Sequence, residues 1–214
     1  IITPLIGIGQ PNLLMFEPTY ADELEVILRY TFSYMQEPKG SSVYIRLSTR
    51  NIPQIKREIS KSLEEEILSG GYWLEKPKNK SNITIIFSGV MAPEVQEALQ
   101  ILQEDNLDVS VLSVTSADRL YKNWKESQKK RSMGNKNLSR IEKLFTETSK
   151  ESVIVTLIDA HSSSLTWIGG AVGKKTISLG VDEFGQSGNL KDLYHHYSID
   201  ADAIVDACAQ ALSN

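Results

Sequence analysis

Imidazole is the side chain most often used for proton transfer near neutral pH, and the chain contains three histidines, His161, His195 and His196. His195 and His196 lie near the end of a predicted helix, where the helix dipole favours an imidazolium and exposure is common. We expect a structural role for these two. His161 follows the apolar strand predicted for residues 153–158, at the edge where open α/β sheets carry functional loops. It is the one candidate catalytic residue of the chain.

The neighbours of His161 suggest one reaction type and one simpler alternative. Asp159 precedes it and serines occupy positions 162–164, so an acid, a base and a nucleophile are close in sequence, as a hydrolytic triad would need. No second histidine or shaped glycine turn supports such a triad, and serines that precede a helix are also expected to cap it. We therefore expect no catalytic residue in this chain. If there is one, His161 is the candidate.

The known cofactor and metal motifs are absent. Gly7 and Gly9 begin a dinucleotide fingerprint, but Asn12 replaces its third glycine. Residues 169–175 do not form a phosphate-binding Walker loop, and Gly185, Ser187 and Gly188 have the wrong order for a nucleophile elbow. No spacing of cysteine, histidine or aspartate matches a zinc or calcium site. We expect no cofactor-binding and no metal-binding residue in this chain.

Composition narrows the class of protein. The 214 residues are 41% hydrophobic and 23% charged, with a net charge of -4, as in ordinary soluble globular proteins. There is no basic excess for nucleic acid, and the cluster at 129–131 is typical of a solvated helix end.

A single cysteine, Cys208, lies on an apolar helix face and is expected to be a buried, inert thiol. The chain also has no secretory signal and no apolar run of membrane-spanning length. Together with the lone cysteine, these features indicate a cytoplasmic protein that binds no membrane. The sequence begins with Ile1, and we expect it to be a piece of a longer protein.

The elements expected to position these residues form an α/β fold. Apolar strands are predicted at 83–87, 109–112, 153–158 and 176–179, with amphipathic helices between them. Several strands are apolar on both faces, which is typical of a parallel sheet covered on both sides. Residues 82–214 are therefore predicted to be a three-layer domain whose mostly parallel sheet has about five strands, with GYWLE or the final strand at an edge.

Two shorter segments precede this domain. Residues 1–51 contain a strand at 13–16, a helix that Thr19 and Asp22 are expected to start, and a strand at 43–47, which is too little for a core of its own. We interpret them as the tail of a preceding domain.

Residues 52–81 are interpreted as a linker. Asn51 and Pro53 predict the start of its helix, and Gly70 and Gly71 its end; a short strand and a polar turn at 76–82 follow.

Several stretches, in order, resemble one family. PNLLMFEPTYADELEVIL, followed by SVYIRLSTRNIPQ, is similar to the end of the pyrimidine-binding domain of the homodimeric 2-oxoacid dehydrogenase decarboxylating component and its transketolase relatives. SGVMAPEVQEALQILQEDNLDVSVLSVTSADRLY resembles the start of that family's carboxy-terminal domain. IDAHSSSLTWIGG and LGVDEFGQSG resemble two of its later turns.

This resemblance implies a thiamine-diphosphate- and magnesium-dependent enzyme whose cofactor lies between domains of two subunits. The family's G-D-G…N cofactor signature and its activating glutamate would precede this sequence, so we expect no cofactor bound to this chain and no turnover from it alone. The implied roles are dimer contact and support of the active-site rim. The implied partners are a second identical subunit and a dihydrolipoyl acyltransferase, and Trp73, Trp124 and Trp167 are candidates for interdomain or dimer burial, although core packing is the simpler expectation for Trp167.

The resemblance also bears on the substrate. Transketolases carry a phosphate-binding arginine in L-S-R-Q-N-L-P, and the counterpart here is LSTRNIP, with Thr49 at the arginine position and Arg50 one residue later. A hydroxyl does not neutralise a phosphate dianion as a guanidinium does. This favours a small 2-oxo acid such as pyruvate, unless a loop delivers Arg50. The alternatives are part of a transketolase or deoxyxylulose-phosphate synthase type enzyme, and an interaction module without enzymatic activity.

Overall fold

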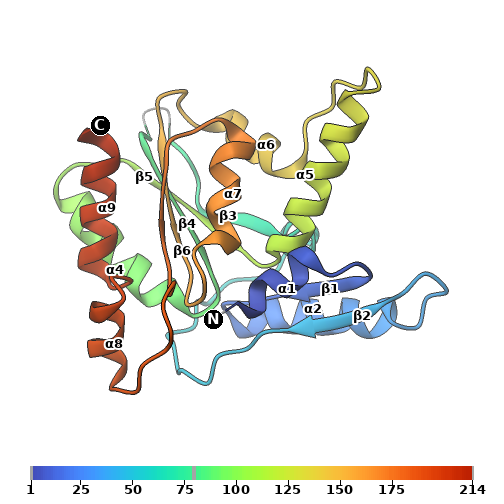
Figure 1. The fold of residues 1–214 in the computed structure, drawn as a ribbon, viewed down its shortest axis with the longest axis horizontal. Helices are drawn as coiled ribbons and strands as arrows, with labels where there is room; N and C mark the ends of the chain where they lie inside the picture. Colours follow the sequence, from blue (N-terminus) through green and yellow to red (C-terminus); the bar gives the residue numbers. More distant parts are fainter. Residues whose placement is uncertain (1, 79–80, 214) are drawn as a thin grey trace.

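The computed structural model describes residues 2–78 and 81–213 and has two β-sheets surrounded by helices (Figure 1). The larger sheet has five strands in the order β3-β5-β4-β6-β7. They are β3 (Gly71–Glu75), β4 (Ile83–Ser88), β5 (Val109–Val114), β6 (Val153–Leu157) and β7 (Thr176–Leu179). All neighbours are parallel except β3 and β5. The predicted mostly parallel sheet is confirmed, and both proposed edge strands lie at edges.

Helices cover both faces of this sheet, which gives the predicted three layers (Figure 1). Alternation along β4 sends Ile85 to one core and Ile86 to the other. The core on the Ile85 face is closed by α4 (Ala92–Glu104) and α9 (Ala201–Ser213). The core on the Ile86 face is closed by α5 (Ala117–Arg131), α6 (Arg140–Leu144) and α7 (Ser163–Val172). Three shorter elements are α8 (Leu190–His196) and the 3-10 turns η1 (Gly89–Met91) and η2 (Phe145–Glu147).

The smaller sheet pairs β1 (Leu13–Phe16) with β2 (Ser42–Ile45) in parallel. It is accompanied by α1 (Thr3–Gly9), α2 (Ala21–Tyr34) and α3 (Lys61–Leu68). Its core includes Ile67 of α3 and Tyr72 of β3, so the small sheet shares apolar contacts with the elements that lead into the large one.

At two helix starts a threonine hydroxyl is occupied by a tertiary contact, and one of them is the Thr19 that was expected to start α2. The Thr19 hydroxyl donates to the carbonyl of Gly89 at 2.9 Å, so α2 is capped by Glu23, which accepts from the amides of Thr19 and Tyr20 at 2.6 and 3.2 Å. The Thr115 hydroxyl donates to the carbonyl of Ile67 at 2.6 Å. Ser116 therefore caps α5.

The linker helix begins later than predicted. Residues 51–60 are not helical, and α3 starts after Ser60, whose hydroxyl accepts from the amide of Leu63 at 3.2 Å. In the preceding segment, Ile52 and Ile55 pack against the core on the Ile85 face of the large sheet, and Arg57 pairs with Asp22. These contacts require an extended chain. Within the polar turn predicted at 76–82, residues 79 and 80 lie outside the described residues.

Gly7 and Gly9 lie in α1 rather than in a nucleotide-binding turn. A Cβ on Gly7 would come within 2.6 Å of the Cβ of Met15, so close packing of α1 on β1 requires this glycine. Across the described ranges, no helix combines the length and the apolar character needed to cross a bilayer.

Candidate functional site

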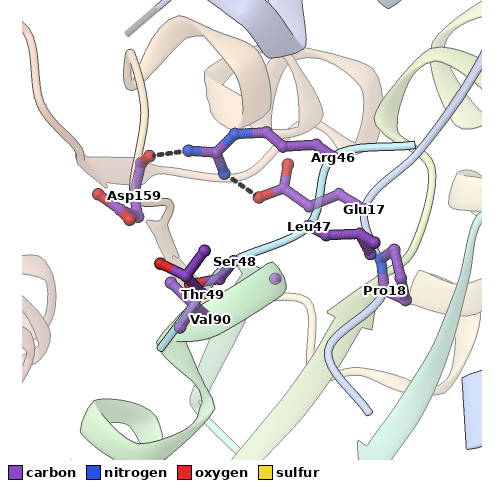
Figure 2. A pocket seen from close by; sticks show the side chains of 9 residues that line it. Glu17, Pro18, Arg46, Leu47, Ser48, Thr49, Val90 and Asp159 are labelled. Atoms are coloured by element: carbon purple, nitrogen blue, oxygen red, sulfur yellow. Dashed lines mark hydrogen bonds and ion pairs between the residues drawn. The ribbon is translucent and has the colours of Figure 1, made fainter. Parts of the chain in front are cut away.

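A polar pocket of about 240 Å³ lies where the carboxyl ends of strands from both sheets meet (Figure 2). Glu17 follows β1, Arg46 follows β2, Gly89 follows β4 and Asp159 lies two residues beyond β6. The carboxyl ends of parallel strands lie at the same edge of a sheet, so the topology brings these residues together. We call this site the Arg46 pocket; Pro18, Leu47, Ser48, Thr49 and Val90 complete its lining.

Arg46 connects the two sheets across the pocket. Its guanidinium donates to a carboxylate oxygen of Glu17 and, at 2.6 Å, to the backbone carbonyl of Asp159 (Figure 2). The Glu17 side chain is almost fully buried, at 6% exposure. The backbone amide of Glu17 also donates to the carbonyl of Thr115, which follows β5, at 2.8 Å. The pocket is thus fixed by bonds between segments that lie up to 113 residues apart.

Gly89 is required by this arrangement. Its φ of +63° lies in the left-handed region, and a Cβ at this position would come within 2.5 Å of the Glu17 carboxylate. The glycine lets the start of α4 approach Glu17 closely.

Burial dominates the electrostatics of the pocket. It raises the pKa of Glu17 above its usual range, against the opposing charge and hydrogen bond of Arg46. It also raises the pKa of Asp159, against the opposing charges of Arg46 and Arg50. The pocket therefore combines two carboxyl groups whose pKa values lie above their usual range with one guanidinium already bonded to one of them.

Thr49 and Arg50 belong to two adjoining pockets. They follow β2 in an irregular segment; Thr49 lines the Arg46 pocket, and Arg50 lines a neighbouring pocket of about 330 Å³. Arg50 bonds both carboxylate oxygens of Glu94, at 2.8 and 2.9 Å, and its guanidinium lies 5.3 Å from the ring centre of Tyr194. Burial, helped by the charge of Asp159, raises the pKa of Tyr194 to about 12, so its phenol stays protonated.

Comparison with known proteins agrees with this architecture. The family described as the transketolase-like TK C-terminal domain matches residues 70–200. This chain belongs to that family. The transketolase-like domain therefore includes β3 and all the other strands of the large sheet.

This transketolase-like chain spans about a quarter of the length of the curated relatives named here. It is 26% identical over 206 residues to the pyruvate dehydrogenase E1 component of Escherichia coli strain K12, covering 95% of this chain and 23% of the relative. The E1 component of Pseudomonas aeruginosa is 27% identical, with 95% and 24% covered. Transketolase-1 of Arabidopsis thaliana chloroplasts is 26% identical, with 93% and 24% covered.

Solved structures share the fold. A split-gene transketolase, described as an inactive beta4 tetramer, superposes with a TM-score of 0.73 at 17% identity, covering 100% of this chain and 62% of that one. The Pichia stipitis transketolase in complex with sedoheptulose 7-phosphate gives 0.70 at 18% identity, covering 100% and 27%.

His161 lies outside the lining of the Arg46 pocket of this transketolase-like chain. Its Nδ1 is 2.8 Å from the Ser163 hydroxyl and 3.5 Å from a carboxylate oxygen of Asp182. Asp159, the acid proposed from sequence, lines the Arg46 pocket, and its backbone carbonyl accepts from Arg46. A hydrolytic relay uses the two imidazole nitrogens separately, whereas both contacts here are at Nδ1. The structure therefore does not assemble the triad, and any other role of His161 stays a prediction.

The other side chains singled out from sequence have local contacts. His195 is 81% exposed and pairs with Asp200 at 2.9 Å, while His196 packs on the ring of Tyr197. The Cys208 thiol is fully buried, as predicted, and burial raises its pKa to about 12.

The three tryptophans pack beside the core on the Ile86 face of the large sheet. Trp124 and Trp167 stack at 5.5 Å, and Trp73 lies 5.8 Å from Phe145. All three are half-buried, and their burial in a dimer stays a prediction.

Glu17, Arg46 and Gly89 are not among the site residues expected from the sequence. Each comes immediately after a short strand, and that position is the one signal the sequence carries for them. Within residues 2–78 and 81–213, no three histidine, cysteine, aspartate or glutamate side chains are grouped as a metal site would need.

Proposed function

We propose that this chain is the carboxy-terminal part of a thiamine-diphosphate-dependent 2-oxo acid dehydrogenase decarboxylating component with a pyruvate-like substrate. Its role is to support the rim of the active site and to contribute contacts between two identical subunits. The observation that carries this proposal is the wall of the Arg46 pocket: Thr49 stands there, and both neighbouring guanidiniums are already bonded within the chain.

A phosphorylated sugar needs a strong cationic ligand for its dianion, and guanidinium forks are the usual one. Arg46 is held by Glu17 and the carbonyl of Asp159, and Arg50 by both oxygens of Glu94. Moving Arg50 onto a phosphate would leave the Glu94 carboxylate, 12% exposed, without its guanidinium. These contacts support a smaller substrate without a phosphate group.

The residues present do not fit the cofactor itself. A magnesium diphosphate needs a group of metal ligands, which the described ranges lack, and the guanidinium of the Arg46 pocket is bonded to Glu17. We derive no catalytic step through the cofactor. We propose that it is held by segments corresponding to the three quarters of the E1 components that this chain does not span.

The proposed domain division places residues 1–51 in a pyrimidine-binding domain, 52–81 in a linker and 82–214 in the carboxy-terminal domain. Strand β3, within the linker of this scheme, pairs with β5 in the large sheet. The proposed partners are a second identical subunit and a dihydrolipoyl acyltransferase, and the proposed compartment is the cytoplasm.

The test is an assay of the natural gene product that contains this chain, supplied with thiamine diphosphate and Mg²⁺. We expect release of carbon dioxide from pyruvate with an artificial electron acceptor, and no transfer of a two-carbon unit from xylulose 5-phosphate. Activity on the phosphorylated ketose would establish the transketolase alternative, and turnover of neither would favour a non-enzymatic module. Titration calorimetry of the chain alone checks the cofactor proposal, which micromolar binding of thiamine diphosphate would contradict.

The transketolase alternative is favoured by one observation, the 26% identity to the Arabidopsis enzyme. The double variant Arg50→Gln with Glu94→Gln removes the guanidinium without leaving a buried charge. If Arg50 binds substrate phosphate, KM for the phosphorylated ketose should rise at least about tenfold. Under our proposal, KM for pyruvate should change less than about twofold.

A further inference from the structure

A second pocket, of about 380 Å³, lies between α2 and the first half of α5 and shares no lining residue with the Arg46 pocket. The rings of Tyr30 and Tyr34 stack at 5.7 Å and form its aromatic wall. Its polar wall contains three cationic side chains, Arg119, Lys122 and Arg140. A concave pocket of this size is suited to a small molecule.

Arg119 has no carboxylate partner among the described residues. Its guanidinium lies 5.2 Å from the ring centre of Tyr30 and 5.7 Å from that of Phe16. One of its terminal nitrogens is buried without a hydrogen-bond acceptor in the described structure. Arg119 also lies in the first turn of α5, where the helix dipole disfavours a cation. An anion bound beside the guanidinium would offset the unfavourable helix dipole and supply the charge partner that Arg119 lacks in the described structure.

The other two cations are partly compensated. Lys122 pairs with Asp118 at 3.2 Å, and Arg140 pairs with Glu66 at 3.0 Å. Even so, the Nε of Arg140 is buried and, in the described structure, has no acceptor.

One carboxylate, the exposed Glu126, also lines the pocket. The lining itself therefore carries three positive charges and one negative charge.

We propose that this pocket binds the oxyanion of a small molecule, a phosphate ester or a carboxylate, with Arg119 as the main ligand and Arg140 as the second. Guanidiniums bind such groups through paired N–H donors, and both arginines line this pocket. The tyrosine wall provides a surface for an aromatic or apolar part beside the anion. This proposal does not depend on the proposed catalytic function.

Isothermal titration of the chain with phenyl phosphate, benzoate and neutral benzyl alcohol tests the proposal. We expect saturable binding of at least one anion and none of the alcohol. Tighter binding of phenyl phosphate would identify a phosphoryl ligand, and tighter binding of benzoate a carboxylate. Arg119→Gln should weaken binding about tenfold to a hundredfold, and Arg119→Lys should weaken it less. The control Lys129→Gln removes a charge from the far end of α5 and should leave affinity unchanged.

A second measurement avoids dependence on the variants. Phenylglyoxal modifies accessible guanidiniums, and mass spectrometry locates the modified residues. The anion that binds should protect Arg119 and leave Arg29, exposed on α2, fully reactive. No saturable binding, equal effects of Arg119→Gln and Lys129→Gln, or unprotected Arg119 would overturn the proposal. So would loss of the binding in the longer natural gene product, because another segment would then occupy the pocket.

Discussion

At the scale of single residues, Arg57 belongs to a network of polar contacts that includes two carboxylates and a tyrosine hydroxyl. It bonds both carboxylate oxygens of Asp22 at 2.7 and 3.1 Å, and the Tyr72 hydroxyl at 2.9 Å. The same hydroxyl donates to Glu23, whose side chain is fully buried. The guanidinium also lies about 5 Å from the ring centres of Tyr20 and Tyr72. One side chain thus connects α2, the linker and β3.

Arg57→Met should lower the free energy of unfolding by about 3–5 kcal/mol, because it leaves the buried Glu23 and the half-buried Asp22 without their cation. The control Arg29→Met breaks a pair with Glu25 that is 63% and 71% exposed, and should cost less than about 1 kcal/mol. Urea denaturation followed by circular dichroism measures both. Similar losses for the two variants would show that the Arg57 network contributes no more than a surface ion pair.

Cys208 should be unreactive in the folded protein. Its pKa of about 12, raised by burial, leaves almost no thiolate at pH 8, and the thiol is closed to solvent. Ellman's reagent should detect no thiol at pH 8 under native conditions, and one per chain in guanidinium chloride. Rapid labelling of the native protein would mean that α9 opens readily.

At the scale of elements, helix starts depend on which side chains remain free to cap them. Ser139 and Glu142 form a complete capping box at α6: Glu142 accepts from the Ser139 amide at 2.7 Å, and the Ser139 hydroxyl accepts from the Glu142 amide at 3.4 Å. Arg131, at the end of α5, donates to the same Glu142 at 2.6 Å. The glutamate thereby links two helices that cover the Ile86 face of the large sheet.

This box gives a pH dependence with a defined sign. Burial raises the pKa of Glu142, but hydrogen bonds from Ser139 and Arg131 outweigh it and lower the pKa below the ordinary 4.5. A lowered pKa stabilises the fold above the unfolded value, and this contribution is lost as pH falls through the folded value. Glu142→Gln should therefore cost about 1 kcal/mol at pH 7, and the difference should vanish below the lowered pKa.

Urea denaturation of both proteins between pH 3 and pH 7 measures this difference. Glu97→Gln, at an exposed position of α4, is the control and should change stability by less than about 0.5 kcal/mol at pH 7. A Glu142→Gln difference that persists unchanged at pH 3 would contradict the assignment.

At the scale of the whole molecule, the small sheet is attached to the large domain by buried polar bonds. The Asp118 carboxylate accepts from the Met15 amide at 3.3 Å, and Lys122 donates to the Leu13 carbonyl at 2.7 Å. Ile67 and Tyr72 also complete the apolar core beneath β1. We therefore expect the small sheet and the large domain to unfold together.

Urea curves from tryptophan fluorescence, which reports on the large domain, and exchange of β1 and β2 amides should give the same free energy. Ile67→Ala should lower both by about 2–5 kcal/mol, because Ile67 is fully buried in the shared core. Leu212→Ala, at a position 42% exposed, is the control and should lower them by less than about 1 kcal/mol. Exchange of the β1 amides at a much lower free energy would show separate unfolding.

Much of the secondary structure of the large domain could be predicted from local sequence patterns. The runs ending at Ser88 and Leu157 are apolar on both faces, so their burial in a parallel sheet follows from residue type and period. The cap of α9 is equally local, since the Asp200 carboxylate accepts from the Ala203 amide at 3.0 Å. Thr19 and Thr115 had the same local pattern, yet distant carbonyls use their hydroxyls instead.

The sequence by itself therefore determined the alternation of strands and helices, the parallel sheet and the family resemblance, because each depends on residues a few positions apart or on an ordered set of short motifs. The tertiary structure alone decided the Arg46 pocket, since Arg46 and Asp159 are 113 residues apart and meet only when strand ends of the two sheets converge. It also decided that Arg50 bonds Glu94, 44 residues away. Contacts of this kind depend on how separate elements pack, which no local spacing encodes.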